Sequence, residues 1–291
     1  MTNVIVVTGA NSGIGRATAI HLAQQGGQVV GTVREQSRAT KLQGMAADAG
    51  VEVPLVELDV ADDASVASGF AEIFDRFGAI DVLVNNAGVG STGTVEDTTT
   101  ANYLDVINVN LLGAVRCLQQ VLPAMRERGA GTIVNITSVA GQFGSPAQAS
   151  YTASKWAFEG LSEALALEVA SFGIRVVIIE PGVTKSAIFA KNVDTPGNTG
   201  AYDMQYRRLL DFYAAGLANA TDPSEVAALV HHAITTDEPK LRYACSWGAR
   251  EIIDTRSRVS DDEWVGLGRF EDDADYRAEF HRLFGVDITP S

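Results

Sequence analysis

The chain has 291 residues, of which 36 are acidic and 22 basic, and its formal net charge is −14 at pH 7. This length allows one large α/β domain or two small ones, and the acidic surplus argues against nucleic acid or an anionic membrane as a partner. The two cysteines, Cys117 and Cys245, are too few for a disulfide framework and fit a reducing compartment. The sequence shows no basic leader before an apolar run and no apolar stretch of ~20 residues. We therefore expect a cytoplasmic protein without a signal peptide or a membrane span.

Short apolar runs alternate with helical patterns up to Glu180. The runs predicted as strands are Val4–Thr8, Gln28–Val33, Val53–Asp59, Ile80–Asn85, Thr132–Thr137 and Ile174–Glu180. The segments predicted as helices are Gly13–Gln25, Gln36–Ala49, Asp62–Phe77, Asn102–Arg128 and Tyr151–Phe172. Continuous Val, Ile and Leu runs are typical of strands buried on both faces of a parallel sheet. The pattern predicts one doubly wound, Rossmann-type α/β domain with about seven parallel strands and helices on both faces.

The regular alternation ends at Pro181-Gly182. The segment Ser186–Asn219 mixes polar and aromatic residues, and we expect it to form a mobile lid over the substrate. A helix is predicted to begin near Asp222-Pro223, and Lys240–Ser246 is a candidate last strand. The acidic tail, Asp261–Glu279, is interpreted as surface helices of the same domain.

A glycine-rich turn follows the first predicted strand, with the sequence Thr8-Gly9-Ala10-Asn11-Ser12-Gly13-Ile14-Gly15. A helix that begins there presents free backbone N–H groups, which can bind the pyrophosphate of a dinucleotide. Gly9 permits the tight turn, Gly13 lets the phosphates approach the backbone, and Gly15 lets the helix pack close to the sheet. The spacing differs from the commoner Gly-x-Gly-x-x-Gly, so the turn alone is only moderately specific.

Tyr151 and Lys155 stand four residues apart in a predicted helix, and Ser138 precedes Tyr151 by thirteen residues. Positions i and i+4 share a helix face, so both side chains can enter one site. An ammonium group at ~4 Å attracts a phenolate by about 4 kcal/mol at an effective dielectric near 20, which favours tyrosine ionisation before desolvation opposes it. Ser138 ends the preceding strand and can hydrogen-bond a substrate oxygen on which charge develops. A partly buried tyrosine beside a snorkelling lysine is the structural alternative, and the position of Ser138 disfavours it.

Ordered matches make the chain resemble the short-chain dehydrogenases/reductases over roughly residues 3–186. The matches are the glycine turn, Asp59-Val60, Asn85-Asn86-Ala87-Gly88, Asn110, Ser138, Tyr151-Thr152-Ala153-Ser154-Lys155 and Pro181-Gly182. The resemblance implies that Tyr151 is the general acid/base and that Ser138 orients the reacting oxygen. It also implies that Lys155 holds the nicotinamide ribose and that Asn110 holds a water that relays protons to Lys155.

The same resemblance implies a set of cofactor contacts within a core formed by residues 3–186, with 187–291 as the lid and a C-terminal helical extension. The candidates, besides Tyr151 and Lys155, are Gly9, Asn11, Ser12, Gly13, Ile14, Gly15, Asp59, Val60, Asn86, Ala87, Gly88, Pro181, Gly182, Val183 and Ser186. Asp59 and Val60 would border the adenine, and the backbone of Val183 would meet the carboxamide. Ser186 stands where relatives often carry threonine, and the retained hydroxyl is expected to preserve that contact.

The end of the second strand predicts the form of the cofactor. Folds that prefer NAD usually place Asp or Glu there to bind the ribose 2′-hydroxyl, and this chain has Val33 instead. Arg34 follows and can pair with a 2′-phosphate. We therefore predict NADP(H), with NAD(H) as the alternative, although the neutral Ser12 replaces a basic residue that many NADP-preferring relatives carry.

The lid composition favours an apolar ketone or alcohol larger than a few carbons as the substrate. The side chains concerned are Phe189, Tyr202, Met204, Leu209, Leu210, Phe212 and Tyr213. Packing of the lid onto the body is an equally open explanation. Arg207 and Arg208 could instead meet a substrate carboxylate, although adjacent arginines are more often solvated.

Other functions and sites remain as alternatives. A non-catalytic nucleotide-sensing protein would need a degraded catalytic group. A sugar-nucleotide epimerase usually has another glycine spacing. Net acidity disfavours a reductase of carrier-bound acyl chains. Family resemblance implies a homodimer or homotetramer paired through the long helices, with small residues such as Gly113, Ala153 and Ala157. We predict no metal site, interpret the acids of the tail as a solvated face, and interpret Cys117 as a packing residue.

Overall fold

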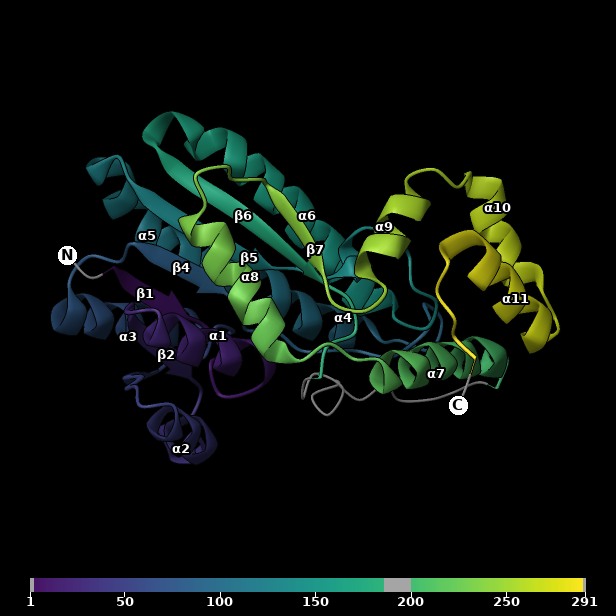
Figure 1. Cartoon of the computed structure of the whole chain (residues 1–291), viewed down its shortest axis with the longest axis horizontal. Coiled ribbons are helices and arrows are strands. Elements are labelled where there is room, and N and C mark those ends of the chain that lie inside the picture. The colour runs from purple at the N-terminus through teal and green to yellow at the C-terminus, as the bar shows by residue number, and fades with distance from the viewer. Residues whose placement is uncertain (1–2, 186–199, 290–291) are drawn as a thin grey trace.

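The computed structural model describes residues 3–185 and 200–289. One parallel sheet has the strand order β3-β2-β1-β4-β5-β6-β7. The strands are β1 (Val4–Val7), β2 (Gln28–Val33), β3 (Leu55–Glu57), β4 (Val82–Asn85), β5 (Gly131–Ile136), β6 (Ile174–Pro181) and β7 (Arg242–Cys245). Figure 1 shows the helices arranged around this sheet. The predicted doubly wound sheet of seven parallel strands is confirmed.

The helices follow the predicted alternation with several differences. They are α1 (Gly13–Gln24), α2 (Thr40–Asp48), α3 (Asp63–Phe77), α4 (Thr100–Ile107), α5 (Gly113–Arg128), α6 (Ala149–Val169), α7 (Asp203–Ala218), α8 (Pro223–Thr235), α9 (Ala249–Arg256), α10 (Asp261–Gly266) and α11 (Asp273–Phe284). Short turns η1 (Gln36–Arg38), η3 (Val139–Gly141), η4 (Ala170–Phe172) and η6 (Leu267–Arg269) are 3₁₀ helices. The prediction contained neither α7 nor α9 as a helix.

The long helix predicted around Asn102–Arg128 is present but contains a change of helix type. A π-helical turn, η2 (Asn108–Leu112), separates α4 from α5. The side chain of Asn108 donates to the carbonyl of Ala61 at 3.2 Å, and that of Asn110 donates to the carbonyl of Val89 at 3.0 Å. Both amides are thus held by groups outside the helix, at the point where it widens. Such π turns often mark functional sites.

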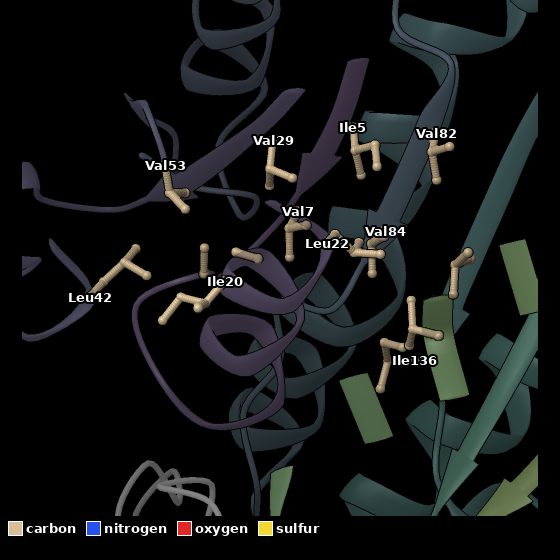
Figure 2. Packing of buried hydrophobic residues seen from close by; sticks show 14 of the residues in the cluster. Ile5, Val7, Ile20, Leu22, Val29, Leu42, Val53, Val82, Val84 and Ile136 are labelled. Carbon is tan, nitrogen blue, oxygen red and sulfur yellow. The ribbon is translucent and has the colours of Figure 1, made fainter. Parts of the chain in front are cut away.

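Two apolar layers hold the helices on opposite faces of the sheet. Ile5 and Val7 of β1 belong to one buried cluster, together with residues of α1, α2 and α8, and Figure 2 shows part of this packing. Val4 and Val6 belong to the other cluster, with residues of α3, α5 and α6. Successive strand residues point to opposite faces, and each fully buried aliphatic side chain contributes about 1.5–3 kcal/mol. Apolar residues at every position of β1 therefore fix both layers.

The C-terminal extension packs against α7. A third buried cluster combines residues of η3, α7, α9 and α11, among them Val139, Ala215, Ile252 and Phe280. In Figure 1 the end of the chain returns to α7 beside α10 and α11. The remainder of the predicted lid, residues 186–199, lies outside the described residues and includes Ser186 and Phe189. No described helix is long and apolar enough to cross a bilayer.

Candidate active site

A cavity of about 350 Å³ lies at the carboxyl ends of the central strands. The chain leaves β1 toward β2 on one side and reaches β4 on the other, and open α/β sheets bind ligands at such a switch point. The predicted residues that line the cavity are Gly9, Asn11, Ser12, Gly13, Ile14, Arg34, Asp59, Val60, Asn86, Ala87, Gly88, Ser138, Tyr151, Lys155, Pro181, Gly182 and Val183. Gly15 and Asn110 are not among the lining residues. The fold therefore brings the glycine turn and the Tyr/Lys pair into one cavity.

The glycine turn is held against the end of β4. Gly9 has φ +66°, and a Cβ atom there would lie 2.9 Å from the Cα of Ala87. The Thr8 hydroxyl accepts the backbone N–H groups of Asn86 and Ala87, each at 3.0 Å. A Cβ on Gly15 would overlap the amide of Asn86, which donates to the carbonyl of Thr8 at 2.9 Å. Side chains larger than hydrogen would thus displace the turn from the start of α1, where the backbone N–H groups can hold phosphates.

Charged side chains surround the end of β2. Arg34, Glu35 and Arg38 all line the cavity. The Arg38 guanidinium lies 2.8 Å from the Glu35 carboxylate, and the Arg38 carbonyl accepts the Asn11 amide at 3.1 Å. Arg34 forms no ion pair with any residue of the described ranges. Its charge is therefore available to an anionic ligand.

Ser138, Tyr151 and Lys155 meet at the other end of the cavity. Ser138 Oγ accepts the N–H of Ala140 at 3.1 Å and donates to the carbonyl of Pro181 at 3.4 Å. Lys155 Nζ donates to the carbonyl of Ile136 at 3.1 Å and lies 5.7 Å from the centroid of the Tyr151 ring. Two side chains of one helix face and the end of β5 thus converge, as the spacing predicted.

Burial dominates the electrostatics of Tyr151 and Lys155. Burial raises the pKa of Tyr151, while the hydrogen bond with Ser138 lowers it. Burial lowers the pKa of Lys155 to about 8, while the charge of Glu159 raises it. Desolvation penalises the charged form of each group, the phenolate of Tyr151 and the ammonium of Lys155. The sequence sets this desolvation against the attraction of the Lys155 ammonium group, and that attraction stays a prediction.

Asn110 is engaged on three sides. Its carbonyl oxygen accepts the N–H of Val89 at 2.8 Å, and its amide donates to the Val89 carbonyl and to Ser154 Oγ, both at 3.0 Å. Ser154 Oγ in turn donates to the carbonyl of Tyr151 at 2.7 Å. Asn110 therefore connects the loop after β4 to the first turns of α6. The water-relay role stays a prediction.

The open end of the cavity has aromatic and amide groups that the sequence analysis assigned only in part. Phe143, Gln148, Phe212 and Tyr213 line it. Gln148 donates to the Tyr213 hydroxyl and accepts from Ser145 Oγ at 2.9 Å. Burial raises the pKa of Tyr213, so its hydroxyl is neutral at physiological pH. Gln148 was missed, and the signal that could have found it is a polar residue in the loop immediately before the Tyr151 helix.

Arg207 and Arg208 both pair with Asp273, and only Arg208 is buried, whereas the Arg207 side chain is 57% exposed. Arg208 Nε lies 2.9 Å from Asp273, its side chain is 7% exposed, and Arg207 lies 3.1 Å from the same carboxylate. Arg277 of α11 pairs with Asp211 of α7 at 2.8 Å. The interpretation of the acidic tail as a wholly solvated face is therefore wrong for Asp273. The prediction missed these pairs because the partners lie more than sixty residues apart.

The remaining candidates have structural roles. Cys117 is fully buried, and burial raises its pKa to about 12, so its interpretation as a packing residue is confirmed. The rings of His21 and His231 lie edge to face with centroids 5.7 Å apart, between α1 and α8. Residues 3–185 and 200–289 contain no group of three or more His, Cys, Asp or Glu side chains that could hold a metal ion.

Comparison with known proteins places this site in a family. The short chain dehydrogenase family matches residues 3–197. The mouse 17-beta-hydroxysteroid dehydrogenase type 1 is 38% identical over 82% of this chain and 72% of its own length. The structure of a short-chain dehydrogenase from Streptomyces avermitilis matches with a TM-score of 0.78 and 33% identity, over 93% of this chain and 99% of that one. The structure of an actinorhodin polyketide ketoreductase variant with NADPH matches with a TM-score of 0.70 and 32% identity, over 84% and 95% of the two chains.

The chain belongs to the short chain dehydrogenase family. It is therefore an oxidoreductase of the dehydrogenase/reductase class that uses a nicotinamide dinucleotide.

Proposed function

We propose that the protein interconverts a ketone and a secondary alcohol with NADP(H), and that Tyr151 is the general acid/base. The observation that carries the proposal is that Ser138, Tyr151 and Lys155 line the same cavity as the glycine turn. A dinucleotide whose phosphates lie at the start of α1 would have its other end near Tyr151. The bound cofactor supplies the hydride for reduction or accepts it in the reverse direction.

The roles of the three side chains follow from their donors and acceptors. In reduction, the carbonyl carbon gains a hydride and its oxygen gains a proton, and the Tyr151 hydroxyl is the proton donor. Ser138 donates to the same oxygen once it releases the Pro181 carbonyl, a bond of 3.4 Å that is long and easily exchanged. Lys155 brings an ammonium group to a buried site, where it stabilises the phenolate left on Tyr151.

The preference for NADP(H) rests on Arg34. The guanidinium lines the cavity without an ion pair in the described part of the chain, whereas the neighbouring Glu35 is held by Arg38. A 2′-phosphate could therefore pair with Arg34 while the carboxylate of Glu35 is paired with Arg38. The structure of the related ketoreductase was solved with NADPH, which supports the same choice.

The substrate is proposed to be an apolar ketone, cyclic or aromatic in character. Phe143 and Phe212 supply aromatic surface at the open end of the cavity, and Gln148 and Tyr213 supply one neutral polar group. No Arg or Lys side chain other than Lys155 lines the cavity at this end among the described residues. The mouse relative is named for a hydroxysteroid, a large apolar alcohol, and this name agrees with the proposal.

A homodimer or homotetramer is proposed from the outer face of α6. Trp156 and Leu167 are 51% and 79% exposed, and Ala153, Ala157 and Gly160 on the same helix are exposed as well. Exposed apolar surface of this kind marks protein contacts. Gly113 does not contribute, because a Cβ atom there would meet Val60 at 2.9 Å inside the chain. Light scattering at micromolar concentration should show a dimer or tetramer, and a monomer would contradict this proposal.

A substrate screen tests the proposed function. Oxidation of NADPH is followed by its absorbance with cyclohexanone, acetophenone and a 17-ketosteroid, and with pyruvate and acetoacetate as small charged controls. We expect turnover on the apolar ketones and kcat/KM at least about tenfold lower on the charged acids, a difference of ~1.4 kcal/mol. Best activity on the charged acids would contradict the apolar pocket, and no activity on any carbonyl would contradict the reaction.

We further propose a cytoplasmic location, supported by two cysteines that are both free.

A further inference from the structure

Two buried carboxyl groups interact with each other, one of them also acts on Lys155, and the reaction described above uses neither. Glu159 follows Lys155 by one turn of α6, and Glu180 lies near the end of β6. Their residues are only 5% and 2% exposed. Carboxylates are almost never buried to this extent unless they are paired, so their partners define what the pair can do.

The guanidinium of Arg242 and the amide of Gln142 each contact both carboxyl groups. Gln142 Nε2 donates to Glu180 at 2.8 Å and to Glu159 at 3.3 Å. Arg242 Nε lies 3.0 Å from Glu159 and 3.9 Å from Glu180, while its Nη2 pairs with the exposed Glu163 at 2.7 Å. Arg242 is thus shared among three carboxyl groups. The hydroxyl of Thr137, which donates to the carbonyl of Ile179 at 3.1 Å, also lies beside Glu159 and lowers its pKa.

The unequal distances assign the charge within the pair. Burial raises the pKa of Glu159, but Glu159 has the closer guanidinium, so it is the member of the pair that ionises first. Burial and the charge of Glu159 raise the pKa of Glu180 to about 7, so Glu180 carries a proton in a large fraction of molecules at neutral pH. Cys245, which also faces Glu180, is neutral because burial raises its pKa to about 12. In the molecules in which Glu180 is protonated, the buried pair therefore holds a single negative charge, on Glu159.

Lys155 depends on that charge. Its Nζ donates to the neutral carbonyl of Ile136 and faces the rings of Tyr151 and Phe158 at 5.7 and 5.8 Å. Burial lowers the pKa of Lys155 to about 8, and the charge of Glu159 opposes this change. The turn that follows Ser138 fixes the arrangement, because a Cβ on Gly141 would lie 2.8 Å from Cγ of Glu159 and 3.1 Å from the carbonyl oxygen of Lys155.

We propose that Glu159 is a positioning residue that keeps Lys155 in its ammonium form. Glu180 is the member of the pair that binds a proton, and the protonated pair then holds one negative charge. The ammonium form is the one that donates to ribose hydroxyls and stabilises a phenolate on Tyr151. This inference rests on the proposed function for the role of Lys155 at the cofactor.

Binding of NADPH as a function of pH tests the inference without a substrate. The fluorescence of bound NADPH gives its Kd, and in the native protein the Kd should rise as Lys155 deprotonates. In Glu159→Gln this rise should begin at a lower pH, because the amide removes the charge that raises the pKa of Lys155. The pKa falls by one unit for each ~1.4 kcal/mol of lost attraction. Lys155→Met should abolish the rise. The control, Glu163→Gln, removes an equally close partner of Arg242 that is 58% exposed, and should keep the native profile.

The outcomes separate this inference from the proposed function. A Glu159→Gln protein with the native pH profile would overturn the inference, as would a Glu163→Gln protein with the same shift. If circular dichroism shows that Glu159→Gln does not fold, Glu159→Asp replaces it. The shorter side chain moves the charge away from Lys155, so the pH profile should shift downward by a smaller amount. An unshifted profile would overturn the inference. A native protein that does not bind NADPH contradicts the proposed function. In that case, NMR titration of ¹⁵N-lysine-labelled protein measures the pKa of Lys155 directly, with Lys155→Met to assign its signal. The inference predicts a lower pKa of Lys155 in Glu159→Gln than in the native protein.

Discussion

Arg208 on α7 lies 2.9 Å from Asp273, the first residue of α11, and the guanidinium stacks 4.2 Å from the centroid of the Tyr276 ring. The same helix α7 carries Phe212 and Tyr213 into the cavity. The C-terminal extension therefore fixes the helix that supplies the open end of the site. A described part of the predicted lid is thus bound to the body, and substrate binding should depend on residues far from the chemistry.

Asp273→Ala tests this dependence. It removes the partner of two arginines and leaves the guanidinium of Arg208 buried without an ion pair, which costs roughly 3–5 kcal/mol for a fully buried pair and less at this partly exposed carboxylate. We expect a Tm lower by several °C and a higher KM for the best ketone of the screen, with the Kd of NADPH unchanged.

Asp261→Ala is the matched control, because Asp261 pairs with Arg256 at 2.7 Å but its side chain is 88% exposed. Exposed pairs contribute about 0–1 kcal/mol, so this variant should keep the native Tm and KM. Equal effects of the two substitutions would show that α11 does not hold α7 through Asp273.

Glu180→Gln tests the buried carboxyl pair through stability. Burial and then Glu159 raise the pKa of Glu180 from 4.5 to about 7. Between these values the folded state binds more protons than the unfolded state, so the free energy of unfolding falls as pH rises through this window. The amide of a glutamine at this position does not ionise, so it avoids this loss of unfolding free energy. Glu180→Gln should therefore have a higher Tm than the native protein at pH 8 and no such advantage at pH 5.

Differential scanning calorimetry at the two pH values measures this effect, and ~1 kcal/mol corresponds to roughly 2–4 °C for a chain of this size class. Glu163→Gln serves as the exposed control. A Tm that is lowered equally at both pH values would mean that the Glu180 carboxylate is stabilising in its charged form.

Arg34→Ala tests the preference for the phosphorylated cofactor. A guanidinium paired with a 2′-phosphate makes charge-assisted hydrogen bonds worth about 1.5–3 kcal/mol. The ratio of kcat/KM for NADPH to that for NADH should therefore fall by roughly tenfold or more. Arg38→Ala, at a guanidinium already paired with Glu35, should change the ratio less. A native protein that prefers NADH, or a ratio that Arg34→Ala leaves unchanged, contradicts the assignment.

The sequence was sufficient for features that depend on local patterns. The apolar run of β1 and the glycines after it predict a buried strand and a phosphate turn, and the structure has both in place. Tyr151 and Lys155 share a face because helix geometry alone puts them there. Pro54, which lacks an N–H donor, shortens the strand predicted from Val53, since β3 begins at Leu55.

Features that depend on distant partners were out of reach. The π turn at Asn110 requires Val89, and the burial of Arg208 requires Asp273, so neither can be inferred from neighbouring residues. The size of the desolvation that raises the pKa of Tyr151 was also out of reach, because desolvation depends on the folded cavity.

The turnover of Tyr151→Phe tests the central claim most directly. The substitution keeps the ring and removes the proton donor, and general acid catalysis is worth roughly 10²–10⁴-fold. With the best ketone of the screen and saturating NADPH, kcat should fall by at least ~10²-fold. The Kd of NADPH, measured by fluorescence, should stay within about a factor of three, because the lost hydroxyl contributes only ~0.5–1.5 kcal/mol to binding. Near-native kcat in a Tyr151→Phe protein that binds NADPH normally would contradict the assignment of Tyr151 as the general acid/base.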